Sequence, residues 1–240
     1  MKILAVSDVQ SQSLENVLEN TPEKYSDIDC IISCGDLEAD YLDFIVDRLG
    51  LRLFFVSGNH VFRDETISPD ARDELWKSSQ AFRQNPRPRI AGNDDIHGRA
   101  ETFKDFIIVG FGGSMWYNGQ ENQFTEKQMQ NIVNSVKSKI NFIRLKDFIL
   151  RRKRKDIIAI SHAPAACIHD LNDLCHKGFE CFKNFIKKYS PIVWLHGHVH
   201  PDGGNGKVQT SKLDGTTIVN VYGCKIIEIE GNKVSVKSHC

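Results

Sequence analysis

The sequence KILAVSDVQ, residues 2–10, carries four apolar residues that run directly into Ser7 and Asp8. A short apolar run of this length is typical of a buried β-strand, and the polar residue after it lies at the edge of the sheet. In open α/β sheets, binding sites form outside the carboxyl ends of the strands. The stretch therefore predicts a strand over residues 2–7 that delivers the Asp8 carboxylate to such a site.

Apolar runs of this kind alternate with helical patterns along most of the chain. They predict strands at 2–7, 28–33, 51–56, 98–103, 106–111, 156–160 and 191–195. A long helix is predicted over 125–152, with Thr125 and Gln128 as its capping box. Shorter helices are predicted at 13–20, 40–48, 70–84 and 177–188. This alternation indicates a mixed-sheet α/β domain, and we expect one domain over residues 1–240.

The C-terminal stretch has a different pattern. Residues 206–239 alternate between apolar and polar side chains, with DG and GN pairs at the turn positions. Such a pattern predicts a meander of antiparallel strands. Residues 61–97, which contain NPRPR and GNDD, are predicted to form an irregular excursion.

Charge and composition limit the classes of partner. The chain has 31 Lys and Arg residues against 31 Asp and Glu residues, so no net charge attracts nucleic acid or an anionic membrane. No apolar run approaches the roughly 18 residues of a membrane span, and the N-terminus lacks a signal-peptide core. The seven cysteines form no C-x-x-C pair, so we expect buried or free thiols and a cytoplasmic location.

Five predicted strands are each followed by Asp, Asn or His. The segments after them begin SDVQ at Ser7, CGDLEAD at Cys34, SGNH at Ser57, SHAPAACIHD at Ser161 and HGHVH at His196. Because the carboxyl ends of parallel strands share one edge, these side chains are expected to lie along one rim. The rim residues are Asp8, Gln10, Asp36, Asn59, His60, His162, His198 and His200.

These residue types fit a site for two divalent cations. Mixed carboxylate, amide and imidazole ligands suit manganese, iron or zinc. Two such ions can orient a phosphoryl group and offset charge on the attacking and leaving oxygens. Asp36 is our candidate for a carboxylate that bridges both ions. The neighbouring glycines would let the loop backbones approach the ions closely.

The motifs Asp8-Val9-Gln10, Gly35-Asp36, Gly58-Asn59-His60, His162 and Gly197-His198-Val199-His200 together resemble the calcineurin-like metallophosphoesterase family. Their order and spacing cover residues 8–200, and the chain looks like a small bacterial or archaeal phosphodiesterase-type member. The resemblance implies a four-layer αββα sandwich with two mixed β-sheets. It places the metal site at the C-terminal ends of the strands.

The resemblance also implies a role for each residue of the rim. Asp8, residue 10, Asp36 and His200 would hold one metal, and Asn59, His162 and His198 would hold the other together with the shared Asp36. His60 would stabilise the transition state and assist the leaving oxygen. The implied reaction is phosphate-ester hydrolysis by a hydroxide shared between two divalent ions. We expect manganese first, with iron, zinc, magnesium or nickel as alternatives.

Gln10 departs from the family pattern, which has histidine at this position. An amide oxygen is a harder and weaker ligand than imidazole, so Gln10 would loosen the first site and favour Mn²⁺ or Mg²⁺ over Zn²⁺. Gln10 could instead face a water, or the first site could be empty and the protein act as a binding or scaffold module. We expect a working site, because a scaffold has no need for His60.

The remaining features leave alternatives open. Trp116 and Tyr117 could stack on a substrate base or belong to the core. His169 and Asp170 could contact substrate, support the metal ligands or be ordinary residues of a loop and helix start, and His176 is assigned no role. We expect a small phosphodiester or nucleotide-type substrate, with nucleic acid as a less favoured partner. The sequence assigns no residue to substrate binding and does not indicate an oligomeric state.

Overall fold

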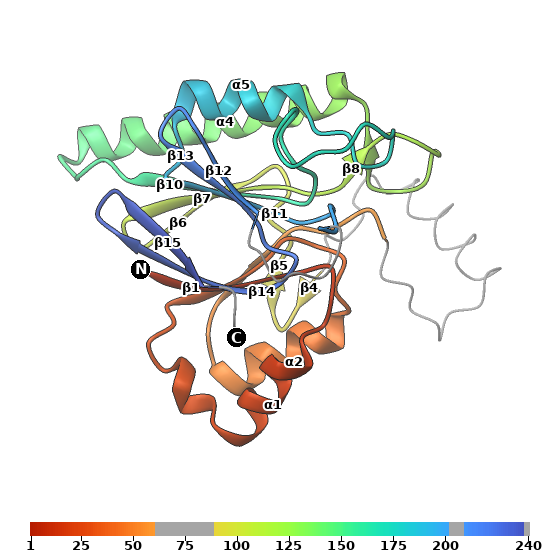
Figure 1. Cartoon of the computed structure of the whole chain (residues 1–240). Coiled ribbons are helices and arrows are strands. Elements are labelled where there is room, and N and C mark those ends of the chain that lie inside the picture. The colour runs from red at the N-terminus through yellow and green to blue at the C-terminus, as the bar shows by residue number, and fades with distance from the viewer. Residues whose placement is uncertain (61–88, 202–208, 238–240) are drawn as a thin grey trace, which may run out of the picture.

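Two main β-sheets lie face to face at the centre of the molecule (Figure 1). The computed structural model describes residues 1–60, 89–201 and 209–237. The first sheet has the order β15 (Lys233–Lys237), β14 (Gly223–Glu230), β1 (Lys2–Ser7), β2 (Cys30–Ser33) and β3 (Leu53–Phe55). The second has the order β12 (Thr210–Leu213), β13 (Thr216–Asn220), β11 (Val193–His196), β10 (Asp156–Ser161), β7 (Phe106–Phe111) and β6 (Ala100–Phe103).

Helices cover the outer face of each sheet. Helices α1 (Gln12–Asn20) and α2 (Ala39–Leu49), with the short 3-10 helix η1 (Pro22–Tyr25), lie against the first sheet, and α4 (Glu126–Ile149) and α5 (Glu180–Tyr189) lie against the second. Between the sheets, Ile3 and Ile32 of the first pack in one buried cluster with Ile158 of the second. The layers therefore run helix, sheet, sheet, helix, and the predicted αββα sandwich is confirmed.

The continuous apolar runs arise because the central strands are covered on both faces. In β1, Ile3 and Ala5 face the other sheet, whereas Leu4 and Val6 face the α1 and α2 side. Successive side chains of a strand point to opposite faces, so burial on both sides requires an apolar residue at each position. The same alternation occurs in β10 and in β7.

Strand direction brings the polar segments to one edge. Strands β1, β2 and β3 are parallel, and so are β7, β10, β11 and β13. Both sheets are mixed, because β14 runs antiparallel to β1 and β6 runs antiparallel to β7. The loops at the carboxyl ends of the parallel strands gather on the right of Figure 1.

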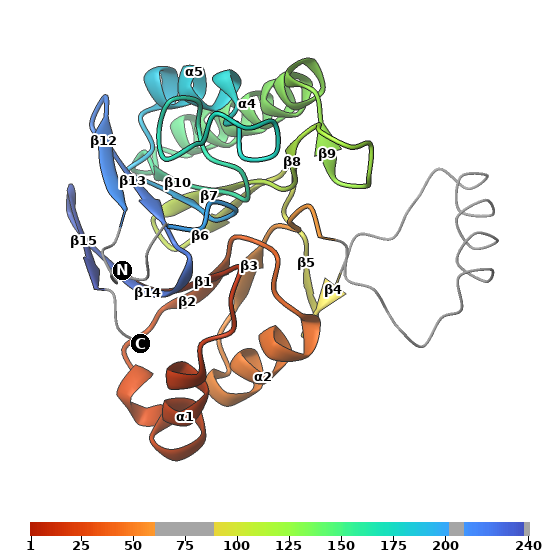
Figure 2. The ribbon, with the colours of Figure 1, turned by 45° about the vertical axis from the view of Figure 1, so that its right-hand side comes forward.

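The C-terminal strands form two separate hairpins. Turns occur at Asp214-Gly215 and Gly231-Asn232, where the DG and GN pairs predict them. A single antiparallel meander is wrong, however, because β12–β13 belongs to the second sheet and β14–β15 to the first (Figure 2). Strand β13 pairs parallel with β11, and β14 then pairs antiparallel with β1. The chain thus crosses from one sheet to the other after Asn220.

Most predicted elements are present with small shifts at their ends. Thr125 forms both hydrogen bonds of the predicted capping box, but α4 ends at Ile149. Two short strand pairs were not predicted: β4 (Arg89–Ile90) with β5 (Asn93–Asp94), and β8 (Ser114–Met115) with β9 (Gln123–Phe124). The predicted helix at 70–84 and most of the expected excursion at 61–97 lie outside the described residues.

None of the helices in the described ranges has a stretch long and apolar enough to cross a membrane. Free thiols, as expected, occur at Cys30, Cys34, Cys167, Cys175 and Cys181. Cys224 is disulfide-bonded, so the expectation of free thiols is wrong at that position.

Candidate metal centre

Two matching tight turns bring the two sheet edges together. After β1, the Val9 amide donates to the Ser7 carbonyl over 2.7 Å, and after β11 the Val199 amide donates to the Gly197 carbonyl over 2.8 Å. The central residues, Asp8 and His198, have φ values of 66° and 67°. Such strained backbone is concentrated at functional sites. The His198 amide also donates to Asp8 Oδ1 over 2.9 Å, which joins the two turns directly.

Glycines allow the loops to approach one another. A side chain at Gly197 would overlap Ser7 Oγ and would lie 2.5 Å from Asp8 Oδ2. A side chain at Gly58 would overlap the Asp36 carboxylate. These overlaps explain why glycine stands at both positions, and they agree with the expectation that glycines let the ligand loops crowd together.

His162 is fully buried at the centre of the group. Its Nδ1 lies 2.8 Å from the Cys34 carbonyl, which can only accept, so Nδ1 carries the proton that it donates. Its Nε2 lies 2.9 Å from Asn59 Oδ1 and 3.2 Å from Asp36 Oδ2. A histidine whose Nδ1–H is held by a backbone carbonyl presents Nε2 as a metal ligand.

The charges of His162 and Asp36 support each other. Burial lowers the pKa of His162, but the carboxylates of Asp36 and Asp8 and the Cys34 carbonyl together outweigh burial, and the pKa is raised overall. For Asp36, burial raises the pKa, but His162 and His60 together outweigh burial, and the pKa is lowered. Asp36 is therefore held as a carboxylate in the middle of the group.

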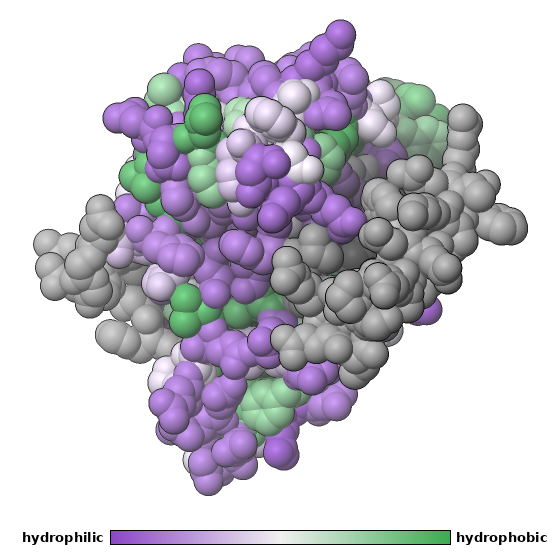
Figure 3. Space-filling model, turned by 90° about the vertical axis from the view of Figure 1, so that its right-hand side faces the viewer, coloured by the Kyte–Doolittle hydropathy of each residue, from purple (hydrophilic) through white to green (hydrophobic). Residues whose placement is uncertain are grey.

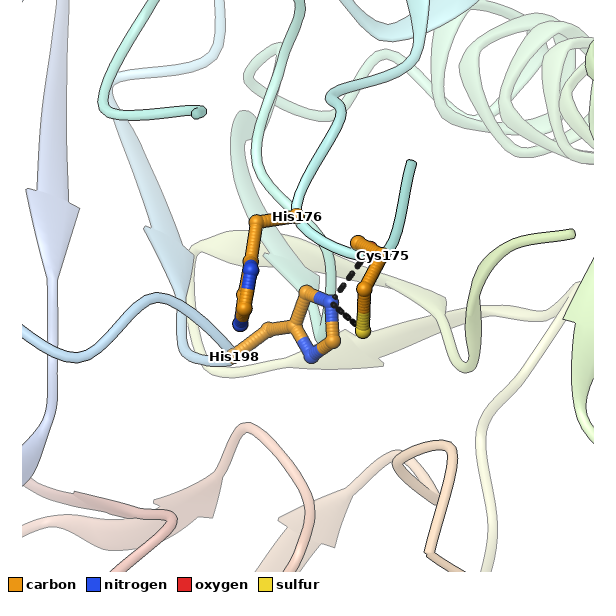
Figure 4. Close-up of side chains that lie close together, drawn as sticks. All are labelled: Cys175, His176 and His198. Carbon is orange, nitrogen blue, oxygen red and sulfur yellow. Dashed lines mark hydrogen bonds between the residues drawn. The ribbon is translucent and has the colours of Figure 1, made fainter. Parts of the chain in front are cut away.

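His198 presents its other ring nitrogen. Its Nε2 lies 2.8 Å from the Cys175 carbonyl, so Nε2 carries the donated proton and Nδ1 has the free lone pair. Nδ1 points away from Cys175 (Figure 4). Burial and the adjacent His162 lower the pKa of His198 to about 3, which keeps the ring neutral. Asp36, His162 and His198 each place a ligand atom within 4.8 Å of the others.

Asp8 has a buried oxygen that lacks a partner. Asp8 Oδ2 has no hydrogen-bond partner among the described residues, and burial raises the pKa of the carboxyl group. A buried polar oxygen without a partner is costly unless a proton or a cation compensates it. This orphan oxygen lies beside a set of carboxylate, amide and imidazole donors. The group therefore fits divalent cations.

Asn59 and His60 extend the group in two directions. Asn59 is buried, and its Nδ2 donates to the Tyr117 hydroxyl over 3.3 Å, which directs Oδ1 towards His162. His60 donates its backbone amide to Asp36 Oδ1 over 3.0 Å, and its Nε2 lies 3.8 Å from Asp36 Oδ2. The His60 side chain is 78% exposed, so it is accessible to a molecule that arrives from solvent.

Gln10 and His200 lie on the open side of the site. The Gln10 amide nitrogen donates to Glu38 Oε2 over 3.3 Å, which leaves its carbonyl oxygen for another partner. The His200 ring is exposed and lies 4.7 Å from the Tyr222 ring. Within the described ranges, no hydrogen bond or ion pair joins Gln10 or His200 to the other predicted ligands. The structure thus brings six of the eight predicted residues into direct contact and leaves Gln10 and His200 on the open side of the site, without such a bond to these six described residues.

The loop between β10 and α5 supports the site. His169 Nδ1 lies 2.9 Å from His196 Nε2, and His169 Nε2 lies 2.8 Å from Ser211 Oγ. Asp170 accepts a hydrogen bond from the Gly178 amide over 3.2 Å. These contacts fit the reading of His169 and Asp170 as ordinary loop residues. This loop carries the Cys175 carbonyl to His198, a contact that sequence reasoning missed.

A family model for calcineurin-like phosphoesterases matches residues 1–202. The chain belongs to the calcineurin-like phosphoesterase family. The family is a superfamily of metal-dependent phosphoester hydrolases that typically bind divalent metals, so the centre described above is where such metals are expected in this chain. A comparison with curated protein sequences gave no match.

Solved structures share the fold of this chain at low sequence identity. The Thermus thermophilus protein TT1561 is 14% identical, with 98% of this chain and 97% of that chain covered and a TM-score of 0.58. A dimetal phosphatase from Danio rerio is also 14% identical, with 99% and 95% covered and a TM-score of 0.51. GAP50, the anchor in the inner membrane complex of Plasmodium, is 11% identical, with 99% and 83% covered and a TM-score of 0.54.

Proposed function

We propose that this protein is a dinuclear metal-dependent phosphodiesterase. The observation that carries the proposal is the convergence of Asp36, His162 and His198 beside the orphan oxygen of Asp8. Both Asp36 oxygens face the group, since Oδ1 accepts from the His60 amide and Oδ2 faces His162. This orientation supports Asp36 as the carboxylate shared by two cations.

The remaining ligands divide between two positions. We assign Asn59, His162 and His198 to one cation, and Asp8, Gln10 and His200 to the other, with Asp36 common to both. When bound, the ions would act as Lewis acids on the phosphoryl group and would acidify water to supply the nucleophile. Manganese remains our first choice for both positions, because the donor set combines oxygen and nitrogen ligands.

His60 would act on the leaving group. Its ring is exposed beside Asp36 and is therefore reachable by a substrate bound at the centre. A histidine in this place can donate a proton to the departing oxygen and stabilise charge that develops on it. The backbone hydrogen bond from His60 to Asp36 Oδ1 fixes the start of the side chain relative to the metal position.

The surroundings of the centre support a polar substrate. On the face at the carboxyl ends of the strands, the described side chains are mostly hydrophilic (Figure 3). Tyr117 reaches the centre through its hydrogen bond with Asn59, and the neighbouring Trp116 is 53% exposed. These aromatic rings support stacking on a base and hence a small phosphodiester or nucleotide-type substrate.

A cytoplasmic location is likewise a proposal. It is supported by the five free thiols of the described residues but not by the disulfide at Cys224.

Hydrolysis of a chromogenic diester tests the proposal. We expect the metal-free protein to gain activity on bis-nitrophenyl phosphate when Mn²⁺ is added, and to prefer this diester to nitrophenyl phosphate. The variant Asp8→Ala should lose the activity, whereas Asp40→Ala, which changes an exposed aspartate of α2, should keep it. A preference for the monoester would contradict the diesterase assignment.

The second candidate function is a binding or scaffold module with a phosphoesterase fold. The specific observation in its favour is Gln10, whose side-chain nitrogen donates to Glu38, while no hydrogen bond joins Gln10 to another predicted ligand among the described residues. No hydrolysis of either ester with Mn²⁺, Mg²⁺, Zn²⁺ or Ni²⁺ would favour this candidate over the enzyme.

A further inference from the structure

A second group of ligand-type side chains lies beside the metal centre (Figure 4). Cys175, His176 and His198 each offer one ligand atom, and these atoms lie within 4.8 Å of one another. Cys175 Sγ is 3.9 Å from His198 Nε2, and the rings of His176 and His198 are 5.0 Å apart between centroids. Cys175 and His176 come from the loop between β10 and α5, whereas His198 follows β11.

One thiolate and two imidazoles form a ligand set suited to zinc. Zinc bond lengths of about 2.3 Å to sulfur and 2.0–2.1 Å to nitrogen, at a tetrahedral angle, place sulfur and nitrogen roughly 3.5 Å apart. The observed separation of 3.9 Å between Cys175 Sγ and His198 Nε2 is a few tenths of an ångström longer. Small side-chain rotations can close this difference. A water molecule would complete the tetrahedron.

His176 is oriented as a metal-binding histidine would be. Its Nδ1 lies 2.9 Å from Asp173 Oδ1, so Nδ1 carries the proton and Nε2 has the free lone pair. Metal-binding histidines commonly donate their second nitrogen to a carboxylate, which fixes the tautomer and raises the basicity of the ligand. Asp173 also accepts from the His176 backbone amide over 3.0 Å, so the carboxylate itself is held in place.

We propose that Cys175, His176 and His198 bind a zinc ion that competes with the cations of the phosphoesterase centre for His198. The two sites share one ring, since Nε2 lies near the carbonyl and sulfur of Cys175 and the ring also offers a ligand nitrogen within 4.8 Å of Asp36 and His162. Because Nε2 carries the proton, the lone pair that remains for the other cations is on Nδ1. Zinc at Nε2 replaces the hydrogen bond to the Cys175 carbonyl. The ring proton then moves from Nε2 to Nδ1, which can no longer bind a cation, and the thiol proton goes to solvent. The zinc ion also places a positive charge next to the neighbouring cations.

Competition of this kind is reciprocal. Zinc at the Cys175 group weakens cation binding at Asp36 and His162, and those cations weaken zinc binding by the same factor. Zinc would thereby inhibit hydrolysis without contacting the substrate. This consequence, unlike the zinc site itself, rests on the proposed phosphoesterase function.

Cobalt spectroscopy tests the site independently of activity. Co²⁺ added to the metal-free protein should give the near-ultraviolet charge-transfer absorption of a thiolate–cobalt bond, and Zn²⁺ should abolish it by displacement. Cys175→Ser should lose the absorption, whereas Cys167→Ser, which changes an exposed cysteine of the same loop, should retain it. His176→Gln keeps the thiol, and the Co²⁺ concentration that gives half of the full absorption should rise by about tenfold or more. No absorption in the unmodified chain, or absorption that survives in Cys175→Ser, would overturn the zinc site.

A second measurement tests the competition. Calorimetric titration should show Mn²⁺ binding weakened by about tenfold when one equivalent of Zn²⁺ is present, and Cys175→Ser should reduce this effect. The backbone carbonyl at residue 175 remains in that variant, so the hydrogen bond from His198 is kept. An equal effect of Zn²⁺ in both proteins would overturn the competition. Cobalt absorption without hydrolysis of any ester would support the zinc site and count against the phosphoesterase function.

Discussion

The two halves of the metal centre differ in how firmly their ligands are held. Asn59, His162 and His198 are buried, and a neighbouring carbonyl or hydroxyl group orients each of them. On the other half, Gln10 and His200 are exposed. A ligand that is already oriented loses less entropy when it binds a metal. The buried half is therefore preorganised for a cation, whereas the open half depends on side chains that must still be ordered.

Charge sharpens the same contrast. Asp36, whose pKa is lowered, is common to both halves, and the buried half adds the neutral ring of His198. The open half relies on Asp8, whose pKa is raised by burial, and on the neutral amide of Gln10. A proton competes more strongly with a cation for a carboxylate whose pKa is raised. We therefore expect the buried half to fill first and the open half to bind more weakly.

Removal of Asp36 should erase the difference between the halves. Because Asp36 is the proposed common ligand, Asp36→Ala should reduce the metal content from about two ions per chain to about none and abolish hydrolysis. Elemental analysis after dialysis measures this content, with Asp40→Ala as the matched control in the same segment. If Asp36→Ala still held one ion tightly, Asp36 would not be a ligand common to both cations.

Removal of the His60 ring should affect catalysis and leave both metals bound. His60→Ala should slow hydrolysis of alkyl phosphodiesters by about 10²–10⁴-fold, since these leaving groups need a proton. Nitrophenyl diesters, whose leaving group is stable as an anion, should lose far less. Parallel rate measurements on both ester types, together with metal analysis, separate the two effects. An equal loss on both esters would contradict leaving-group assistance.

A smaller change tests preorganisation on the buried half alone. Tyr117→Phe removes the hydroxyl that accepts from Asn59 Nδ2 and retains the aromatic ring. A hydrogen bond contributes about 1 kcal/mol net, so cation affinity on this half should fall by about three- to tenfold. Calorimetry should show the weaker half unchanged. A loss of cation affinity confined to the weaker half would contradict the assignment of Tyr117 and Asn59 to the buried half.

The sequence predicts the sheet edge well because two strong signals coincide there. Apolar runs identify strands covered on both faces, and the polar residues directly after them must lie at the carboxyl ends. Asp8 and His198 thus meet although 190 residues separate them in the chain. The resemblance then supplies the expected role of each residue, which spacing alone does not provide.

Other contacts depend on loop paths that local patterns do not encode. The Cys175 carbonyl reaches His198 from a loop that His169 ties to His196 and Ser211. No periodicity in the sequence marks a backbone carbonyl as a partner. The C-terminal hairpins show a similar limit, because their turns are local and predictable but the choice of sheet depends on pairing with β11 and β1.

Calorimetric titration of the metal-free protein with Mn²⁺ tests most directly whether the two halves are unequal. The structure predicts a tight site followed by a weaker one, and in Gln10→His the weaker site should tighten by about tenfold or more because imidazole is the stronger ligand. Two equally tight sites in the protein with Gln10, unchanged in Gln10→His, would contradict the account.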